Sequence, residues 1–143
     1  MGEFTVTRYH DFCAGHRVVG HENKCKHFHG HNYRIHFTVS TVDGLDLIGR
    51  VIDFSVIKTL LCEWLEINWD HKFLMYKNDP FLNLMQEMDP SSVVVVQFNP
   101  TAENMARYLV EVVAPNILQG LNCELVECTI DETRKCSASY VKS

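Results

Sequence analysis

The sequence predicts a single α+β domain in which an antiparallel sheet carries two helices on one face. The predicted elements run strand, strand, helix, helix, strand, strand, and such segregated runs favour an antiparallel sheet over alternating β-α-β units. The length of 143 residues fits one domain, and 46% hydrophobic residues are enough for a buried core. Since no repeat, low-complexity tract or Pro/Gly-rich linker divides the chain, residues 1–143 are expected to fold as one unit.

The first part of the predicted sheet comes from two segments. Residues 4–12 are rich in Thr, Val, Tyr and Phe, which favour strands. In residues 32–42, apolar residues occupy every second position, as in a half-buried strand. The polar residues 17–30 between them are expected to form a loop. Asp43-Gly44 predicts a turn, and residues 49–54 are expected to continue or close the sheet.

The first helix is predicted over residues 55–67, because its apolar residues recur three and four positions apart. Ser55 is the predicted N-cap, and Asp70-His71 falls in the loop after this helix. Residues 80–88 predict a short surface helix, and residues 93–98 predict a buried strand.

The second long helix begins at Pro100-Thr101, with Thr101 as its N-cap, and Pro115 is expected to bend or end it. Residues 124–130 and 138–141 then close the chain as strands. The residues expected to face inward from this helix are Met105, Leu109, Val112 and Val113.

Charge and composition exclude several classes of partner. The net charge of −5 gives no basic field for nucleic acid or an anionic membrane surface. The longest apolar runs, such as residues 93–96, are too short to span a bilayer. The N-terminus has no apolar signal region, and Val6 breaks the myristoylation pattern. We therefore expect a cytoplasmic protein whose six cysteines are reduced thiols.

The most informative stretch of the chain is residues 25–31, Cys-Lys-His-Phe-His-Gly-His. In an extended segment, His29 and His31 point to the same side and can bind one metal ion, with His16 as a third imidazole. Three nitrogens with an open fourth position typify a catalytic zinc, whereas Cys25 as a fourth ligand would close a structural site. The spacing alone leaves both alternatives open.

Six motifs resemble the 6-pyruvoyl-tetrahydropterin synthase superfamily over nearly the whole chain. The short spacing between Cys25 and His29 is most similar to the 6-carboxy-tetrahydropterin synthases of the queuosine pathway. This resemblance implies the tunnelling fold, in which subunits pool their sheets into a barrel with helices outside and active sites between subunits. A homo-oligomer follows, and the sequence leaves trimer and hexamer open. The motifs are residues 12–16, 25–33, 49–54, 70–71, 100–104 and 132–133.

The resemblance implies Zn2+ as the cofactor, with His16, His29 and His31 matching the family's three ligands. Cys25 matches the catalytic thiol, so zinc is expected to keep an open position for substrate. His27 lies between Cys25 and His29, and we interpret it as a non-ligand. Competition of its imidazole for the metal is the alternative that the sequence leaves open.

Further roles come from the same resemblance. Asp70 and His71 match the rest of a Cys-Asp-His relay, which a neighbouring subunit contributes. Glu132 matches the carboxylate that anchors the pterin ring, since a carboxylate accepts both parallel ring donors. Thr101 and Glu103 match additional contacts of the pterin pocket, although Glu103 in a first helical turn also suits the helix dipole.

The implied function is a zinc-dependent carbon–carbon lyase that converts 7,8-dihydroneopterin triphosphate to 6-carboxy-5,6,7,8-tetrahydropterin, acetaldehyde and triphosphate. The alternatives are a 6-pyruvoyl-tetrahydropterin synthase or related pterin side-chain lyase, and a non-enzymatic structural zinc module. Arg17, Lys24 and Lys26 are either triphosphate ligands or a solvated cluster. We interpret Asp53 as a turn or strand-end residue and assign no role to the long segment 72–99. The cysteines expected to be inert or buried are Cys13, Cys62, Cys123, Cys128 and Cys136.

Overall fold

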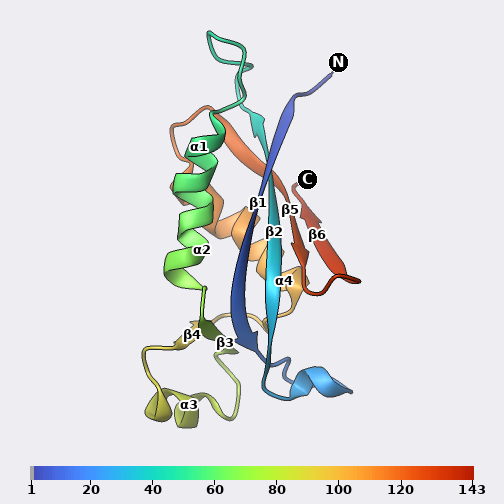
Figure 1. Ribbon diagram of the computed structural model, residues 1–143, viewed down its shortest axis with the longest axis vertical. Coiled ribbons are helices and arrows are strands. Elements are labelled where there is room, and N and C mark those ends of the chain that lie inside the picture. The colour runs from blue at the N-terminus through green and yellow to red at the C-terminus, as the bar shows by residue number, and fades with distance from the viewer. Residues whose placement is uncertain (1) are drawn as a thin grey trace.

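The centre of the fold is a long antiparallel pair of strands, β1 (Thr5–His16) and β2 (His29–Thr41). The two strands pair along their length, from Thr5 opposite Ser40 to His16 opposite His29. The computed structural model describes residues 2–143, and over these residues a six-stranded sheet forms in the order β4-β3-β1-β2-β5-β6 (Figure 1). Both strands of the central pair are longer than the sequence predicts, so that β2 includes the His29-Gly30-His31 motif.

The sheet is mixed, with an antiparallel part and a parallel part. β5 (Cys123–Asp131) and β6 (Ser137–Val141) continue the antiparallel pattern beyond β2, as predicted. β3 (Lys72–Tyr76) instead pairs parallel with β1, and β4 (Val93–Val96) pairs parallel with β3. A helix that returns the chain to the starting end of a strand makes parallel pairing possible. The antiparallel prediction therefore applies to β1, β2, β5 and β6, and the strand β3 was not predicted.

The first helix begins at Asp53 and not, as predicted, at Ser55. The Asp53 carboxylate accepts the Ser55 backbone N–H at 2.8 Å, so Asp53 is the N-cap. Residues 49–54 are consequently turns leading into the helix rather than a continuation of the sheet. The helical segments that follow are α1 (Phe54–Ile57), the π-helical η2 (Lys58–Cys62) and α2 (Glu63–Asn68).

The second helix begins at Thr101 as predicted, because the Thr101 hydroxyl oxygen accepts the Asn104 backbone N–H at 3.1 Å. Pro115 does not end this helix. It lies in the first turn of the segment after a π-helical stretch, where a missing N–H is tolerated. Val112 is 45% exposed, so the prediction that it faces inward was wrong. Met105, Leu109 and Val113 are buried as predicted. The segments are α4 (Ala102–Tyr108), η3 (Leu109–Val113) and α5 (Ala114–Ile117).

The two long helices cover one face of the sheet. In Figure 1, α1 and α2 lie to the left and α4 lies behind β1 and β2. Side chains alternate along a strand, so every second residue faces the helices; the buried ones are residues 12, 14 and 16 of β1 and residues 33, 35, 37 and 39 of β2. Burying one large apolar side chain stabilises a fold by about 1.5–3 kcal/mol. The core side chains from sheet and helices include Phe12, Ile35, Phe37, Val39, Leu61, Leu65, Met105, Leu109 and Ile130.

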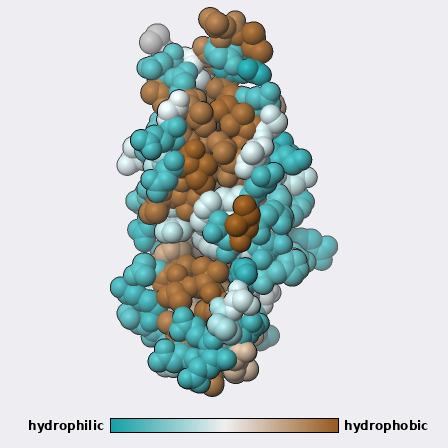
Figure 2. Space-filling view, turned by 90° about the vertical axis from the view of Figure 1, so that its left-hand side faces the viewer, coloured by the Kyte–Doolittle hydropathy of each residue, from teal (hydrophilic) through white to brown (hydrophobic). Residues whose placement is uncertain are grey.

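The opposite face of the sheet is polar, and no helix among residues 2–143 covers it. There Arg34 donates to both oxygens of Asp11, at 2.7 and 3.0 Å, and stacks over Tyr9. His36 pairs with Asp131 at 2.9 Å on the same face. This polar face contrasts with the helix side of the molecule, where Figure 2 shows hydrophobic side chains gathered in two patches between hydrophilic flanks.

Two short segments lie at the end of the sheet where β1 ends and β2 begins. These are the 3₁₀ turn η1 (Lys24–Lys26) in the loop between β1 and β2, and the surface helix α3 (Leu82–Met88) (Figure 1). None of the helices in the described part of the chain has the length and apolar character that a bilayer span requires.

The Thr101 cap gives a test of the second helix. Thr101→Ala is expected to lower the free energy of unfolding by about 0.5–2 kcal/mol, because one helix N–H loses its partner. Thr101→Ser keeps a hydroxyl in the same place and is the matched control. Urea denaturation of both variants measures the difference, and equal stability would contradict the cap.

Candidate functional site

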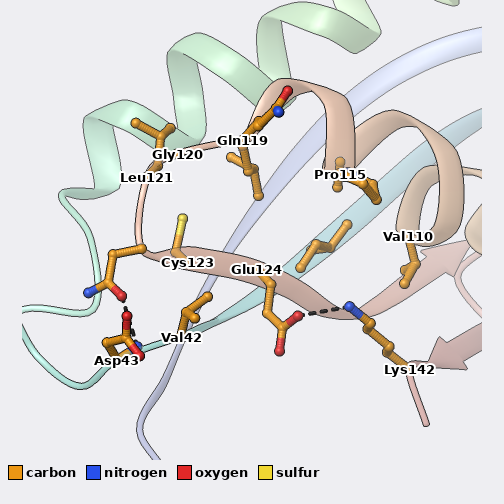
Figure 3. A pocket seen from close by; sticks show the side chains of 14 residues that line it. Val42, Asp43, Val110, Pro115, Gln119, Gly120, Leu121, Cys123, Glu124 and Lys142 are labelled. Atoms are coloured by element: carbon orange, nitrogen blue, oxygen red, sulfur yellow. Dashed lines mark hydrogen bonds and ion pairs between the residues drawn. The ribbon is translucent and has the colours of Figure 1, made fainter.

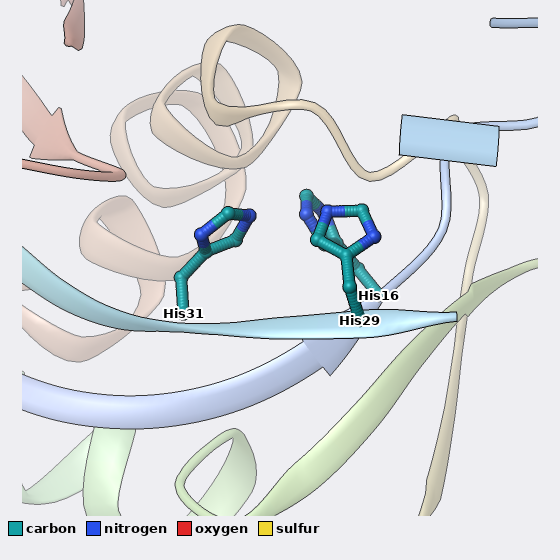
Figure 4. A group of neighbouring side chains, drawn as sticks. All are labelled: His16, His29 and His31. Atoms are coloured by element: carbon teal, nitrogen blue, oxygen red, sulfur yellow. The ribbon is translucent and has the colours of Figure 1, made fainter. Parts of the chain in front are cut away.

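Three histidine side chains converge at one end of the helix-covered face. His16 is the last residue of β1 and lies opposite His29, the first residue of β2. His31 is two residues further along β2 and so faces the same side. The three ring centroids are 4.5–5.0 Å apart, and one nitrogen from each ring lies within 4.8 Å of the others (Figure 4).

Backbone carbonyls orient two of these rings. His16 Nδ1 lies 2.6 Å from the Pro100 carbonyl oxygen, and His29 Nδ1 lies 2.7 Å from that of His27. The Nε2 atoms of His16, His29 and His31 are all buried without a hydrogen-bond partner. An unpaired buried polar atom is costly unless something else satisfies it. Nδ1 bound to a carbonyl with Nε2 left free is the usual arrangement of a metal-binding histidine.

Burial favours the neutral form of two of these imidazoles, those of His16 and His31. It lowers the pKa of His16 to about 4, although the Pro100 carbonyl acts in the opposite direction. Burial also lowers the pKa of His31, against the opposing effect of the Glu132 carboxylate. A neutral imidazole presents the lone pair that a metal requires. Three imidazole nitrogens this close together fit Zn2+, and Cys25 is not part of the group of mutually close donors.

Glu132 and Tyr33 complete the surroundings of the three histidines. Glu132 follows β5, and its Oε1 lies 3.5 Å from His31 Nε2. The Tyr33 ring packs against His16 and His31, and its hydroxyl is buried without a partner. Burial raises the pKa of Tyr33, and the charges of Glu132 and Cys25 raise it further.

The start of α4 also lies beside the histidines. Thr101 follows Pro100, whose carbonyl contacts His16. The Thr101 oxygen accepts the cap hydrogen bond, so its hydroxyl proton stays available to another acceptor. Glu103 is exposed in the first turn of α4 and forms no ion pair or side-chain hydrogen bond with another described residue.

Asp70 and His71 lie on the other face of the sheet. Asp70 Oδ2 accepts from His71 Nδ1 at 2.8 Å, and Asp70 Oδ1 accepts the Cys13 backbone N–H at 3.0 Å. Cys13 is three residues from His16, so its side chain points to the opposite face. The sheet thus separates Asp70 and His71 from the histidine group within one chain.

Cys13 is not buried, so of its predicted state, inert or buried, only the inert alternative is left open. Its side chain is exposed, like that of Cys136, whereas Cys62, Cys123 and Cys128 are buried as predicted. The odd spacing between Cys13 and His16 in a strand was the signal that places it on the open face. All six cysteines are free thiols in residues 2–143.

The other histidines have partners away from the group. His10 pairs with Glu66, and His36 pairs with Asp131. His27 is exposed, and its backbone carbonyl rather than its ring contacts the site.

Arg17 connects the segment after β3 to the loop that carries Cys25. Arg17 Nε donates to Asp79 Oδ2 at 2.7 Å, and Arg17 Nη1 donates to the Lys26 carbonyl at 2.9 Å. The guanidinium lies over the rings of Phe28 and Phe81, 5.3 and 4.7 Å from their centroids. The Arg17 guanidinium is therefore occupied by contacts within the chain. Of the three basic residues, Lys24 and Lys26 remain the candidates for triphosphate binding. No local signal in the sequence links Arg17 to Asp79.

A pocket of about 570 Å³ lies at the far end of the sheet from the histidines, between α5 and the start of β5 (Figure 3). Two of its charged side chains, Glu124 and Lys142, pair with each other at 2.8 Å. Asp43 and Cys123 also line it, but neither belongs to a group of three close metal-binding side chains among the described residues.

Comparisons with known proteins identify the family. The family model for 6-pyruvoyl tetrahydropterin synthase matches residues 5–143. The 6-carboxy-5,6,7,8-tetrahydropterin synthase of Rickettsia typhi is 34% identical over 131 residues, which cover 91% of this chain and 94% of the relative. The corresponding Aquifex aeolicus protein is 30% identical, with 82% and 76% covered. The chain therefore belongs to the 6-pyruvoyl tetrahydropterin synthase family.

Solved structures show the same fold. An uncharacterized protein from Wolinella succinogenes superposes with a TM-score of 0.84 at 23% identity, covering 100% of both chains. The 6-pyruvoyl tetrahydropterin synthase of Caenorhabditis elegans gives a TM-score of 0.68 at 23% identity, covering 100% of this chain and 98% of that one. Both likenesses concern the fold alone.

The ion pair between Arg17 and Asp79 gives a stability prediction. The Asp79 side chain is fully buried, so Asp79→Ala leaves the Arg17 charge without its partner and is expected to cost about 3–5 kcal/mol. Glu124→Ala breaks the exposed pair with Lys142 and is expected to cost about 0–1 kcal/mol. Chemical denaturation measures the free energy of unfolding of both variants. Similar losses in the two would contradict a buried ion pair between Arg17 and Asp79.

The histidine group gives a metal prediction. His29→Ala or His31→Ala is expected to abolish stoichiometric zinc, because two remaining imidazoles bind a divalent ion poorly. His36→Ala removes an imidazole from the open face and is expected to keep zinc. Elemental analysis after dialysis measures the content, and full zinc in both ligand variants would refute the assignment.

Proposed function

We propose that this member of the 6-pyruvoyl tetrahydropterin synthase family is a zinc-dependent carbon–carbon lyase of the 6-carboxy-tetrahydropterin type. Its substrate is 7,8-dihydroneopterin triphosphate, and its products are 6-carboxy-5,6,7,8-tetrahydropterin, acetaldehyde and triphosphate. The observation that carries the proposal is the set of three convergent, unpaired Nε2 atoms. The names of relatives at 34% identity over 91% of the chain support the reaction class. Free thiols fit a reducing compartment such as the cytoplasm.

His16, His29 and His31 are the residues that would hold the metal. When bound there, zinc supplies a Lewis acid that polarises substrate oxygen atoms. The carbonyls of Pro100 and His27 fix the rings of His16 and His29, so these side chains are oriented before any ligand arrives.

Glu132 anchors the pterin ring in this proposal. Its carboxylate accepts the 2-amino group and the adjacent ring N–H as two parallel hydrogen bonds. The distance of 3.5 Å between Glu132 Oε1 and His31 Nε2 supports this role, because an anchored ring then lies beside the metal ligands. Thr101 and Glu103 contribute further pocket contacts, and Lys24 and Lys26 bind the triphosphate.

Cys25 acts as the general base, and Asp70 with His71 completes its proton relay from a neighbouring subunit. Two observations support an arrangement between subunits. The sheet separates Asp70 and His71 from the histidine group of the same chain. The uncovered polar face suits the interior of a barrel made from the sheets of several copies, with the helices outside. Asp70 holds His71 by a 2.8 Å hydrogen bond, which orients the imidazole for proton transfer.

Product analysis tests the reaction. Incubation of the zinc-loaded protein with 7,8-dihydroneopterin triphosphate is expected to release triphosphate and acetaldehyde in equal amounts with the 6-carboxy product. Triphosphate release without acetaldehyde would favour the related reaction that forms 6-pyruvoyl-tetrahydropterin. No turnover with zinc retained would refute an enzyme of this class and favour a structural zinc module.

The role of Cys25 can be separated from that of a metal ligand. Cys25→Ala is expected to keep zinc while losing turnover by about 10²–10⁴-fold, the usual contribution of a general acid or base. Cys136→Ala removes an exposed thiol elsewhere and is expected to leave turnover unchanged. A Cys25→Ala protein that loses zinc and melts at a lower temperature would show that Cys25 closes a structural site.

A site shared between subunits predicts complementation. Mixing inactive Cys25→Ala protein with inactive His71→Ala protein is expected to restore partial turnover, because some interfaces then contain both intact residues. Subunit exchange is followed by mass spectrometry of differently labelled copies. Absence of recovery despite demonstrated exchange would place the complete site within one chain.

A further inference from the structure

The open face of the sheet carries a second group of metal-binding side chains, formed by Cys13, Asp70 and His71. One donor atom from each lies within 4.8 Å of the other two. All three come from the same chain, and the sheet separates them from the three histidines on the helix-covered face. The group therefore differs from the zinc site proposed above in residues and in location.

The chain holds this group in place through its backbone. The Cys13 N–H donates to Asp70 Oδ1 at 3.0 Å, and the His71 N–H donates to the Cys13 carbonyl at 2.7 Å. His71 adopts a left-handed backbone conformation, with a φ of 58°, which a residue other than glycine seldom takes. These contacts fix the turn at Asp70-His71 against the end of β1 and bring the thiol beside the imidazole–carboxylate pair.

The group is also accessible. Cys13 and His71 line two hollows of about 500 and 820 Å³, and Asp70 lines the larger one. The His71 side chain is 79% exposed, so a cation can reach its ring from solvent. The Cys13 thiol lies 3.1 Å from Asn32 Oδ1, an oxygen that can also approach a bound ion.

We propose that Cys13, Asp70 and His71 bind a second divalent cation of the zinc type. A thiolate, an imidazole and a carboxylate are ligands that suit Zn2+ or Co2+, whereas Mg2+ and Ca2+ prefer sites made of oxygen atoms. Three protein ligands leave a position for water or for Asn32. On binding, the Cys13 thiol loses its proton to solvent as the sulfur–metal bond forms.

This cation has a consequence for turnover that rests on the proposed function. Asp70 and His71 belong to the proton relay proposed above, and a cation on them removes the lone pairs that the relay needs. The second equivalent of Zn2+ is therefore expected to inhibit the enzyme, while the first equivalent, on the three histidines, activates it.

Cobalt binding tests the site without reference to turnover. Zinc-loaded protein is titrated with Co2+, and elemental analysis confirms that one zinc per chain is retained. Sulfur-to-cobalt charge-transfer absorption in the near ultraviolet reports binding by a thiolate. We expect this band to saturate at one Co2+ per chain.

Three serine variants assign the thiol in that titration. Cys13→Ser is expected to lose the band and to weaken cobalt binding. Loss of a residue that only supports a ligand costs about 10–100-fold in metal affinity, and loss of the ligand Cys13 is expected to cost more. Cys136→Ser, at the other exposed thiol, is expected to keep both. Because Cys13 is exposed, its serine variant is expected to melt at the wild-type temperature. Absence of the band in the wild-type protein, or its loss in Cys25→Ser and not in Cys13→Ser, overturns the proposal.

Inhibition is measured separately. A second equivalent of Zn2+ is expected to lower turnover of the wild-type protein and to leave that of Cys13→Ser unaffected. Equal inhibition of both proteins would overturn the inhibitory role of this site. If the wild-type protein shows no turnover at all, the proposed function fails, while the cobalt titration still decides whether the site exists.

Discussion

The register between β1 and β2 is the constraint on which the rest of the structure depends. It places His16 opposite His29, so that two imidazoles from different parts of the chain start beside each other. His31 joins them because side chains two apart on a strand share a face. A shift of one residue in either strand would turn its histidines to the opposite face and separate the group. Pairing along the length of two long strands therefore determines the geometry of the proposed metal ligands.

The sheet also divides the chemistry of the chain between its two faces. The helix-covered face is apolar, and burial there keeps His16 neutral and leaves three Nε2 atoms unpaired. The open face is polar and carries Asp70, His71 and Cys13. A single copy thus presents three imidazoles that could hold a metal on one side and an imidazole–carboxylate pair on the other. This separation is the physical reason for proposing that the site is completed between copies.

The segment after β3 has a structural part in the site. Its Asp79 side chain is fully buried and pairs with Arg17, while Phe81 stacks on the same guanidinium. Arg17 in turn donates to the Lys26 carbonyl, in the loop that carries Cys25. Buried charges are retained only when they are well paired. The segment therefore fixes the loop through one ion pair and one aromatic ring.

The sequence by itself determined the α+β class, the Thr101 cap, most of the strands and the same-side placement of His29 and His31, because these depend on local spacing. It misplaced the first N-cap at Ser55, missed β3 and did not place Cys13 at the surface, although strand alternation puts the Cys13 side chain on the other face of the sheet from His16. Only the tertiary structure decided the parallel pairing of β3 and β4, the Pro100 contact to His16 and the pairing of Arg17 with Asp79. These contacts join residues far apart in the chain, so their free energy depends on packing that no local pattern records.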